Sequence, residues 1–320
     1  MFLLILILMN KLFCYTVLLL LSSCQAAFFS ETFSYTENQK GILKIERLDL
    51  SHQNLKTLPK NIRNYKNLQF INLSNNPDLQ LDSAFTVLAA LPQLKIIRLD
   101  SNAITYLPEN IKKLKNVTHL SFVNNPNFHW RKNNDALAEM PKLTTLNFEY
   151  CDFMEVPENI STIKHLRNLR LSHNKINAGA SFTNLSKIEK LKFLWLDNNE
   201  ITFLPPEVAS LNQVVELYLD GNKLTQLPEE IKQCEKLCIL YLGNNQFKEI
   251  PEQIIGIKML YMLVLYNNEI TAIPEKFNNS EIPLAVLVLD KNKLSEEEIK
   301  KSINYFKGFF LFSTKNQRTN

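Results

Sequence analysis

The sequence predicts an α/β solenoid, a curved horseshoe with a parallel β-sheet on its concave face and short helices or turns on its convex face. Composition is the first indication, because 52 of the 320 residues are Leu and 37 are Asn. Periodicity is the second: eleven copies of L-x-x-L-x-L-x-x-N-x-L follow one another at steps of 23 to 26 residues. Repeats of this length build solenoids, in which each unit covers the apolar side of the next. Hydrophobic residues at 45% and charged residues at 21% exclude a disordered or collagen-like chain.

The N-terminal segment, residues 1–23, has the layout of a signal peptide. Read from Met9, which we take as the start, a lysine is followed by an apolar run and then by small residues. The sequence Leu21-Ser22-Ser23-Cys24 resembles the bacterial lipobox. This resemblance implies cleavage before Cys24 and a diacylglyceryl group on its thiol, which would hold the protein on a membrane.

Two alternatives for the N-terminus stay open. A plain signal peptide would be cut near Ala26 or Ala27, and the protein would then be secreted. An anchor starting at Met1 would have to carry Asn10-Lys11 through hydrocarbon, which is costly. Three other cysteines lie in the repeats without an even or clustered disulfide pattern, which favours a bacterial over an animal extracellular origin. The expected location is the bacterial cell envelope, with a lipid anchor.

Residues 24–44 are expected to form a tether and an N-terminal cap, and the eleven repeats occupy residues 45–294. Within each repeat two apolar residues alternate with outward positions, so both point from one short strand into the core. The Asn that follows can donate and accept hydrogen bonds where the chain leaves the strand. The nine asparagines of this predicted ladder are Asn76, Asn102, Asn125, Asn174, Asn199, Asn222, Asn245, Asn268 and Asn292. Gln53 is expected to imitate Asn at longer reach, and Cys151 to fill the position as a small buried residue.

The second half of each repeat predicts the convex side. Seven copies continue as Leu-Pro-x-x-Ile or a close variant, which predicts a short helical turn with Pro at its first position. The two 26-residue copies lack this turn. In each of them Asn-Asn-Pro is followed by a predicted fuller helix, over 82–91 and 135–140.

The repeat pattern resembles that of the leucine-rich repeat family over residues 45–294. The Leu-Pro-x-x-Ile variant is similar to the repeats of Ras-group and many bacterial leucine-rich repeat proteins. The resemblance implies a stacked, nearly one-dimensional coil whose ends need caps.

Residues 295–320 are expected to form the C-terminal cap and tail. Ser295 to Glu298 has the pattern of a capping box that opens a helix. Ile299, Ile303 and Phe306 fall on one stripe of that helix and are predicted to close the last repeat.

The outward strand positions predict a binding surface. Polar and charged residues fill the middle column of the first six repeats, whereas aromatic residues fill it in the next three. Exposed Trp and Tyr in a cluster are typical of binding hot spots, although aromatic residues also favour strands for their own sake. The predicted ligand-binding residues are Phe193, Trp195, Asp197, Glu216, Tyr218, Asp220, Tyr241, Met262 and Tyr266.

A protein partner fits this surface, with aromatic anchors inside an acidic rim. A glycan is the alternative, with sugar rings stacked on Trp195, Tyr218 and Tyr241. Protein is preferred because the spacing of neighbouring strands, about 4.8 Å, does not match the repeat of a sugar chain.

Chemistry-bearing motifs are absent from the sequence. It contains no Gly-rich phosphate loop, no His-Glu-x-x-His and no Gly-x-Ser-x-Gly. No stretch outside the repeats exceeds about 45 residues, which is too short for a separate catalytic domain. We therefore expect no enzyme, no cofactor and no metal, and a net charge of +4 does not favour nucleic acid. An enzyme or regulator built on the concave face, and a passive envelope protein, remain the alternatives.

Overall fold

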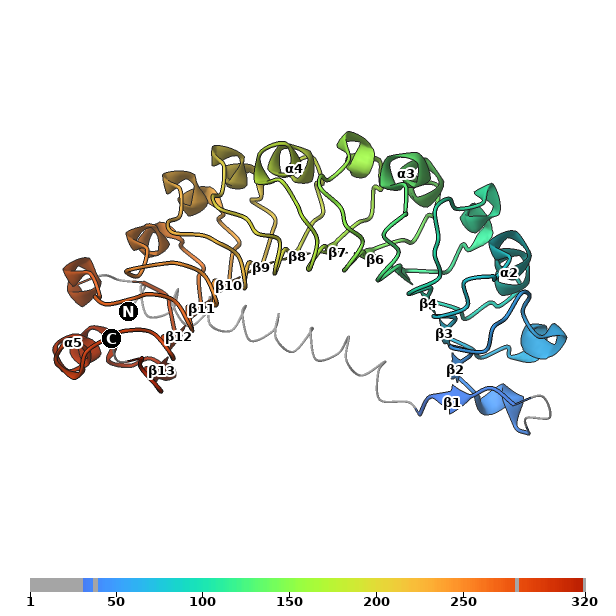
Figure 1. Ribbon diagram of the computed structural model, residues 1–320, viewed down its shortest axis with the longest axis horizontal. Coiled ribbons are helices and arrows are strands. Elements are labelled where there is room, and N and C mark those ends of the chain that lie inside the picture. The colour runs from blue at the N-terminus through green and yellow to red at the C-terminus, as the bar shows by residue number, and fades with distance from the viewer. Residues whose placement is uncertain (1–30, 37–39, 280–281, 319–320) are drawn as a thin grey trace, which may run out of the picture. The chain divides into compact units, whose positions relative to one another are not determined.

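The computed structural model describes residues 31–36, 40–279 and 282–318. These residues form two compact units: the N-terminal unit holds the described residues up to Asn174 together with Lys187–Lys190, and the C-terminal unit holds Lys175–Ser186 together with the described residues from Leu191 onwards. The signal segment 1–23 and Cys24 lie outside the described residues. Within each unit short strands line the inner side and helices the outer side (Figure 1). The predicted fold class, a repeat solenoid with parallel strands, is confirmed.

In the N-terminal unit each strand pairs in parallel with the next strand along the chain. The pairing joins equivalent positions of successive repeats, as between Arg47 and Phe70. The outward residues therefore form straight columns. The strands are β1 (Phe33–Ser34), β2 (Arg47–Asp49), β3 (Phe70–Asn72), β4 (Ile96–Arg98), β5 (His119–Ser121), β6 (Thr145–Asn147) and β7 (Asn168–Arg170).

The C-terminal unit follows the same rule. Neighbouring strands are parallel and in register, so that Phe193, Glu216, Ile239 and Met262 form one column. The strands are β8 (Phe193–Trp195), β9 (Glu216–Tyr218), β10 (Ile239–Tyr241), β11 (Met262–Val264), β12 (Val286–Val288) and β13 (Leu311–Ser313). The last of these lies beyond the eleven repeats that the sequence pattern reveals.

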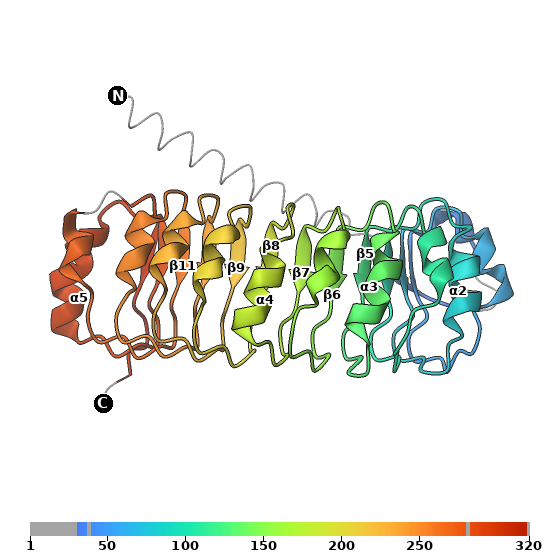
Figure 2. The same ribbon diagram turned by 90° about the horizontal axis from the view of Figure 1, so that it is seen from above.

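The outer side carries one helix per repeat, and Figure 2 looks onto this side. Most are 3₁₀ helices that follow a proline, and here the structure differs from the expectation: Pro108, for example, is the N-cap rather than the first helical residue. Its carbonyl accepts the first helical hydrogen bond, from Ile111. These helices are η2 (Lys60–Asn64), η3 (Glu109–Lys113), η4 (Glu158–Thr162), η5 (Pro206–Ser210), η6 (Glu229–Gln233), η7 (Glu252–Gly256) and η8 (Glu275–Asn279).

Three repeats carry an α-helix on the outer side instead. The two 26-residue repeats hold α2 (Leu81–Leu88) and α3 (Trp130–Ala138), as predicted, and α3 begins five residues earlier than expected. A third helix, α4 (Ala178–Leu185), was not predicted. Its repeat is 25 residues long and Asn177 caps it by accepting a hydrogen bond from Gly179 N–H. The lengthened step was thus the available signal.

The ladder of asparagines holds successive repeats together. The Asn222 side-chain oxygen accepts hydrogen bonds from the backbone N–H of Asn199 and Ile201, each at 3.0 Å. Its side-chain nitrogen donates to the carbonyls of Leu196 at 3.0 Å and Leu219 at 2.9 Å. The other ladder asparagines in the described residues are equally buried and make the same kinds of bonds. Each Asn therefore satisfies backbone groups of the repeat before its own.

This direction explains the two exceptions in the ladder. Gln53 does not imitate Asn: its side chain is exposed, and the backbone at Gln53, Leu55 and Leu50 is bonded by Asn76 of the next repeat. The Cys151 thiol is fully buried, and its single S–H donates to the carbonyl oxygen of Phe122 at 3.1 Å, with that of Glu149 at 3.5 Å. Cys151 thus reproduces the donor half of an Asn side chain in a smaller volume.

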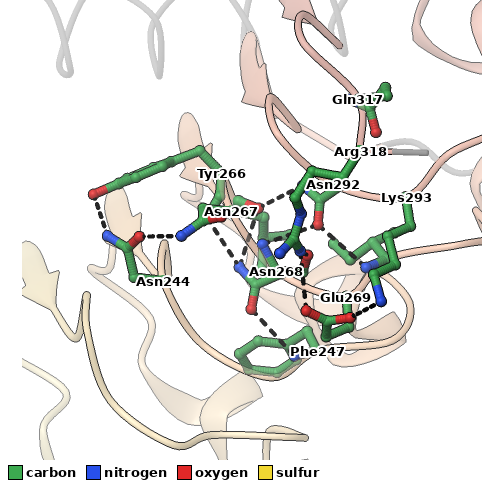
Figure 3. A network of polar contacts seen from close by, with 12 residues as sticks. Asn244, Phe247, Tyr266, Asn267, Asn268, Glu269, Asn292, Lys293, Gln317 and Arg318 are labelled. Carbon is green, nitrogen blue, oxygen red and sulfur yellow. Dashed lines mark hydrogen bonds and ion pairs between the residues drawn. The ribbon is translucent and has the colours of Figure 1, made fainter. Parts of the chain in front are cut away.

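The C-terminal end of the ladder is completed by Gln317. Gln317 takes the role of a ladder Asn for the last described coil: it accepts from Leu294 N–H at 3.0 Å and donates to the Leu289 carbonyl at 2.8 Å. Arg318 next to it bonds the Asn268 carbonyl and the Glu269 carboxylate, which also pairs with Lys293 (Figure 3). Residues 309–318 therefore act as a degenerate twelfth coil.

The capping helix α5 (Glu296–Ser302) differs from its prediction in two ways. Ser295 caps it by accepting from Glu298 N–H at 3.1 Å, but the Glu298 carboxylate accepts from Ile273 N–H of the preceding repeat instead of closing a capping box. Ile303, expected on the apolar stripe, is 51% exposed. The chain tightens after Ser302 into the 3₁₀ helix η9 (Ile303–Phe306), so that Ser302 and Phe306 face the core.

A left-handed residue precedes the ladder position in every repeat. Only Gly adopts this backbone freely, and Asn tolerates it better than other residues. Asn accordingly recurs at this position. One repeat has Gly221 there instead, and its missing side chain leaves room for the side chain of Asn198 in the repeat before. The column consists of His52, Asn75, Ser101, Asn124, Tyr150, His173, Asn198, Gly221, Asn244, Asn267, Lys291 and, before Gln317, Asn316.

We expect Asn222→Ala to lower the free energy of unfolding by about 2 to 4 kcal/mol, because it leaves buried backbone groups of two repeats without partners. Urea unfolding followed by circular dichroism measures the change. Asn212→Ala is the control, since Asn212 is exposed and its loss should change stability by less than about 0.5 kcal/mol. Equal effects of the two substitutions would contradict the ladder's role.

Candidate functional site

An aromatic stack crosses three strands of the C-terminal unit. The rings of Trp195 and Tyr218 lie 5.0 Å apart at 13°, and those of Tyr218 and Tyr241 lie 4.7 Å apart at 11°. The parallel register produces the stack, because it places these residues directly beside one another. All three side chains are partly buried. The rings therefore cover one another's faces, which differs from the fully solvent-facing cluster expected.

Phe193 and Met262 extend the stack into a wider apolar surface. The Phe193 ring lies 6.2 Å from that of Trp195. Met262 and Tyr241 both pack against a small buried cluster that contains Cys238 and Ile239. The predicted aromatic and aliphatic residues are thus brought together on one strand face.

Glu216 does not belong to an acidic rim, contrary to the prediction. Glu216 lies between Phe193 and Ile239 in one column, and the residue is 3% exposed. One carboxylate oxygen accepts a 2.6 Å hydrogen bond from the Tyr218 hydroxyl, whereas Oε1 is buried without a hydrogen-bond partner. Burial raises the pKa of Glu216, and the hydrogen bond from Tyr218 lowers it.

Asp197 and Asp220 also differ from a freely exposed rim, because both bond the backbone of the next repeat. Asp197 accepts from Asp220 N–H at 3.0 Å, and Asp220 accepts from Gly243 N–H. Asp290 has the same role further along the unit, where it accepts from Lys315 N–H at 2.8 Å. Burial, and then the charge of Asp197, raise the pKa of Asp220 to about 7.

Tyr266 lies at the site because Gly243, which was not among the predicted site residues, leaves space for its ring. A Cβ on Gly243 would lie 2.2 Å from Cε1 of Tyr266, so the ring occupies the place of the absent side chain. The Tyr266 hydroxyl accepts from the Asn244 amide at 2.6 Å, and Asn267 donates to Asn244 at 2.6 Å (Figure 3). A glycine in register between Asp220 and Tyr266 was the available signal.

The strand face of the N-terminal unit is polar, as its middle column predicts. Arg98 pairs with Asp100 at 2.9 Å and Arg170 with Glu149 at 3.7 Å. Asp100 also accepts from Val123 N–H, which repeats the backbone role of Asp220. His119 is partly buried rather than a fully exposed surface residue, and burial lowers its pKa.

The described residues were also compared with the requirements of metal sites, membrane spans and reactive thiols, and these features are as follows. They contain no cluster of His, Cys, Asp or Glu suited to a metal ion. None of their helices combines the length and apolarity needed to span a membrane. Burial raises the pKa of the Cys151 and Cys234 thiols to about 12, so both thiols are protonated at neutral pH.

Comparison with known proteins identifies the fold. Residues 189–247 match the leucine rich repeat family model, and no curated protein sequence matches the chain. A leucine-rich repeat protein of Leptospira interrogans is similar with a TM-score of 0.64 and 24% identity, over 91% of this chain and 84% of that one. An internalin of Listeria monocytogenes has a TM-score of 0.60 and 21% identity, over 89% and 85%. The chain therefore has the leucine-rich repeat fold.

A third similar structure is TLR13 in its complex with ssRNA13. The TM-score is 0.67 at 24% identity, and the match covers 86% of this chain but 40% of that one. At these identities the likeness concerns the fold alone.

We expect Asp220→Asn to stabilise the protein at high pH. Because the native carboxyl has its pKa raised to about 7, the folded state binds more protons than the unfolded state below that pH. The free energy of unfolding of the wild-type protein therefore falls as pH rises towards 7. Across this range the free energy of unfolding of the variant should increase by about 2 to 4 kcal/mol relative to that of the wild-type protein. Urea unfolding between about pH 4.5 and about pH 8.5 measures the difference.

The matched control for that experiment is Asp290→Asn. Asp290 occupies the equivalent position and bonds the next coil in the same way. A pH-independent difference between Asp220→Asn and the wild-type protein would contradict the assigned pKa.

Proposed function

We propose that this protein is a non-catalytic binding module, displayed outside the cytoplasmic membrane, that recognises a protein partner through the strand face of its C-terminal unit. The observation that carries the proposal is the stack of Trp195, Tyr218 and Tyr241 on that face. Large aromatic side chains held in fixed positions are common anchors of protein interfaces. Their mutual packing reduces the side-chain entropy lost when a partner binds.

The other ligand classes are less well supported by this surface. A sugar ring stacks on an aromatic face, and the inner faces of this stack are occupied by neighbouring rings. RNA, the ligand named for TLR13, carries phosphates, which carboxylates beside the stack, such as that of Asp197, would repel. Catalysis lacks a recognisable nucleophile at this face.

The stack can be tested without knowing the natural partner. A phage-displayed peptide library is panned on the full chain, and the selected peptides are titrated against variants. We expect the double variant Trp195→Ala with Tyr218→Ala to weaken their binding by about a hundredfold, in the range of hot-spot losses. Arg98→Ala, in the polar face of the N-terminal unit, should leave binding unchanged.

Equal binding by the double variant, with its circular dichroism spectrum preserved, would overturn the proposal. Panels of oligosaccharides and single-stranded RNA are titrated in parallel. Tight binding of either, lost in the double variant, would favour that ligand class instead.

We also propose that Cys24 carries a diacylglyceryl anchor, which the Leu21-Ser22-Ser23-Cys24 sequence supports. Expression in a bacterial host followed by mass spectrometry of the N-terminal peptide is expected to give an acylated Cys24. The Cys24→Ser variant should lack the modification and leave the membrane fraction. An unmodified N-terminus at Ala26 or Ala27 would remove the anchor while leaving the binding function intact.

A further inference from the structure

The last strand of the C-terminal unit, β13, has an open edge (Figure 1). Leu311 N–H donates to the Ala285 carbonyl at 3.1 Å, and the Ser313 carbonyl accepts a 2.7 Å hydrogen bond from Leu289. Successive residues of a strand turn their backbone groups to opposite sides, so the N–H and C=O of Phe312 point away from β12. Since no strand of the described residues lies beyond β13, this edge can accept one more strand.

The side chains along this edge are apolar and exposed. Phe310 is 84% exposed and Leu311 44%, although Leu311 pairs with Val286 in a column of the strand face. The Phe312 ring packs on the buried ring of Phe306, with their centres 4.8 Å apart. Exposed apolar surface beside outward backbone groups is the combination that a peptide strand uses when it adds to a sheet.

Two lysines flank the edge. Lys307 and Lys315 are exposed, and neither takes part in an ion pair with another described residue. The lysines of α5, by contrast, pair with Glu296 and Glu275. The Asp290 carboxylate accepts from the backbone N–H of Lys315 and forms no ion pair with its ammonium group. The edge therefore carries a positive charge without an ion-pair partner on either side of the strand.

These lysines distinguish between two possible occupants of the edge. A second copy of this chain, paired antiparallel about Leu311, would place Lys307 of each copy opposite Lys315 of the other. Like charges directly opposite one another destabilise a sheet. Lysines on an edge strand commonly prevent such pairing between copies. A strand with carboxylates at its ends meets the opposite charge at both positions, so the edge favours an acidic partner over a second copy.

We propose that the open edge of β13 binds an extended segment of a protein partner, with apolar side chains at alternate positions and a carboxylate at each end. The backbone of the segment pairs with that of Phe312, and its apolar side chains cover Phe310 and Leu311. Its carboxylates lie near Lys307 and Lys315. The edge and the aromatic stack belong to different strands, so this second surface goes beyond the proposed function.

The test uses a fluorescent peptide, Glu-Thr-Val-Thr-Val-Thr-Val-Thr-Glu, which is titrated against the full chain by anisotropy. Its end residues have the same separation along the chain as Lys307 and Lys315. One control peptide has lysine in place of both glutamates, and another has proline in place of the three central residues, which removes N–H groups that a strand needs. We expect the original peptide to bind at least about tenfold more tightly than either control.

Two double variants separate a local effect from that of the net charge. Lys307→Glu with Lys315→Glu should reverse the preference, so that the lysine-ended peptide binds about tenfold more tightly than the glutamate-ended one. Lys113→Glu with Lys115→Glu is the matched control, because it changes the net charge equally at two exposed residues of the N-terminal unit. This control should keep the wild-type preference.

Three results would overturn the edge site: no binding of the glutamate-ended peptide, no reversal in the Lys307 and Lys315 variant, or equal binding of the proline peptide. Sedimentation of the chain alone is the second measurement. A dimer that is lost in Phe310→Ser would assign the edge to a second copy and overturn the acidic segment. Trp195→Ala with Tyr218→Ala leaves the edge intact and should bind the glutamate-ended peptide as the wild-type protein does, so the edge and the stack can fail separately.

Discussion

The fold depends on a hydrogen bond between a buried asparagine amide and the backbone of the repeat before it. The amide oxygen of each ladder Asn accepts from N–H groups of the preceding coil. Its amide nitrogen donates to carbonyls of the preceding coil and of its own, as Asn222 does. The amide forms hydrogen bonds with backbone N–H and C=O groups, which a leucine side chain cannot do. The chain can therefore turn away from the strand without leaving buried backbone groups unpaired, which would cost free energy. The bond has a direction, so the first coil tolerates an exposed Gln53 while the last needs Gln317.

The same register that aligns the asparagines determines the strand face. Equivalent positions of successive repeats lie side by side, so any residue type repeated at one position becomes a column. Aromatic residues at one position become the stack of Trp195, Tyr218 and Tyr241, whose rings bury one another's faces. Aspartates two positions later become a second ladder, which bonds the next coil through Asp197 and Asp220. Binding chemistry in this protein is therefore obtained by varying columns on a constant frame.

The sequence predicted the parts of the structure that recur, because the same backbone requirement selects the same residue in each repeat. It did not predict features that depend on how a side chain leans. Glu216 occupies an outward position yet is buried by its neighbours, and Tyr266 reaches Asp220 only because Gly243 has no side chain. Gln317 escaped notice because its coil has lost the leucine pattern. The sequence contains more Asn than the ladder requires. Part of this excess is explained by the asparagines of the left-handed column, such as Asn244 and Asn267.

Residue type alone does not identify function on this surface. Asp100, Asp220 and Asp290 all accept a hydrogen bond from a backbone N–H of the next coil, which is a structural role. Burial, and then the charge of Asp197, raise the pKa of Asp220 to about 7, where a change of charge costs little free energy at neutral pH. Near pH 7 the Asp220 carboxyl group is therefore divided between its protonated and ionised forms. The neighbours of a column position, as well as its own residue type, decide how an aspartate at that position ionises.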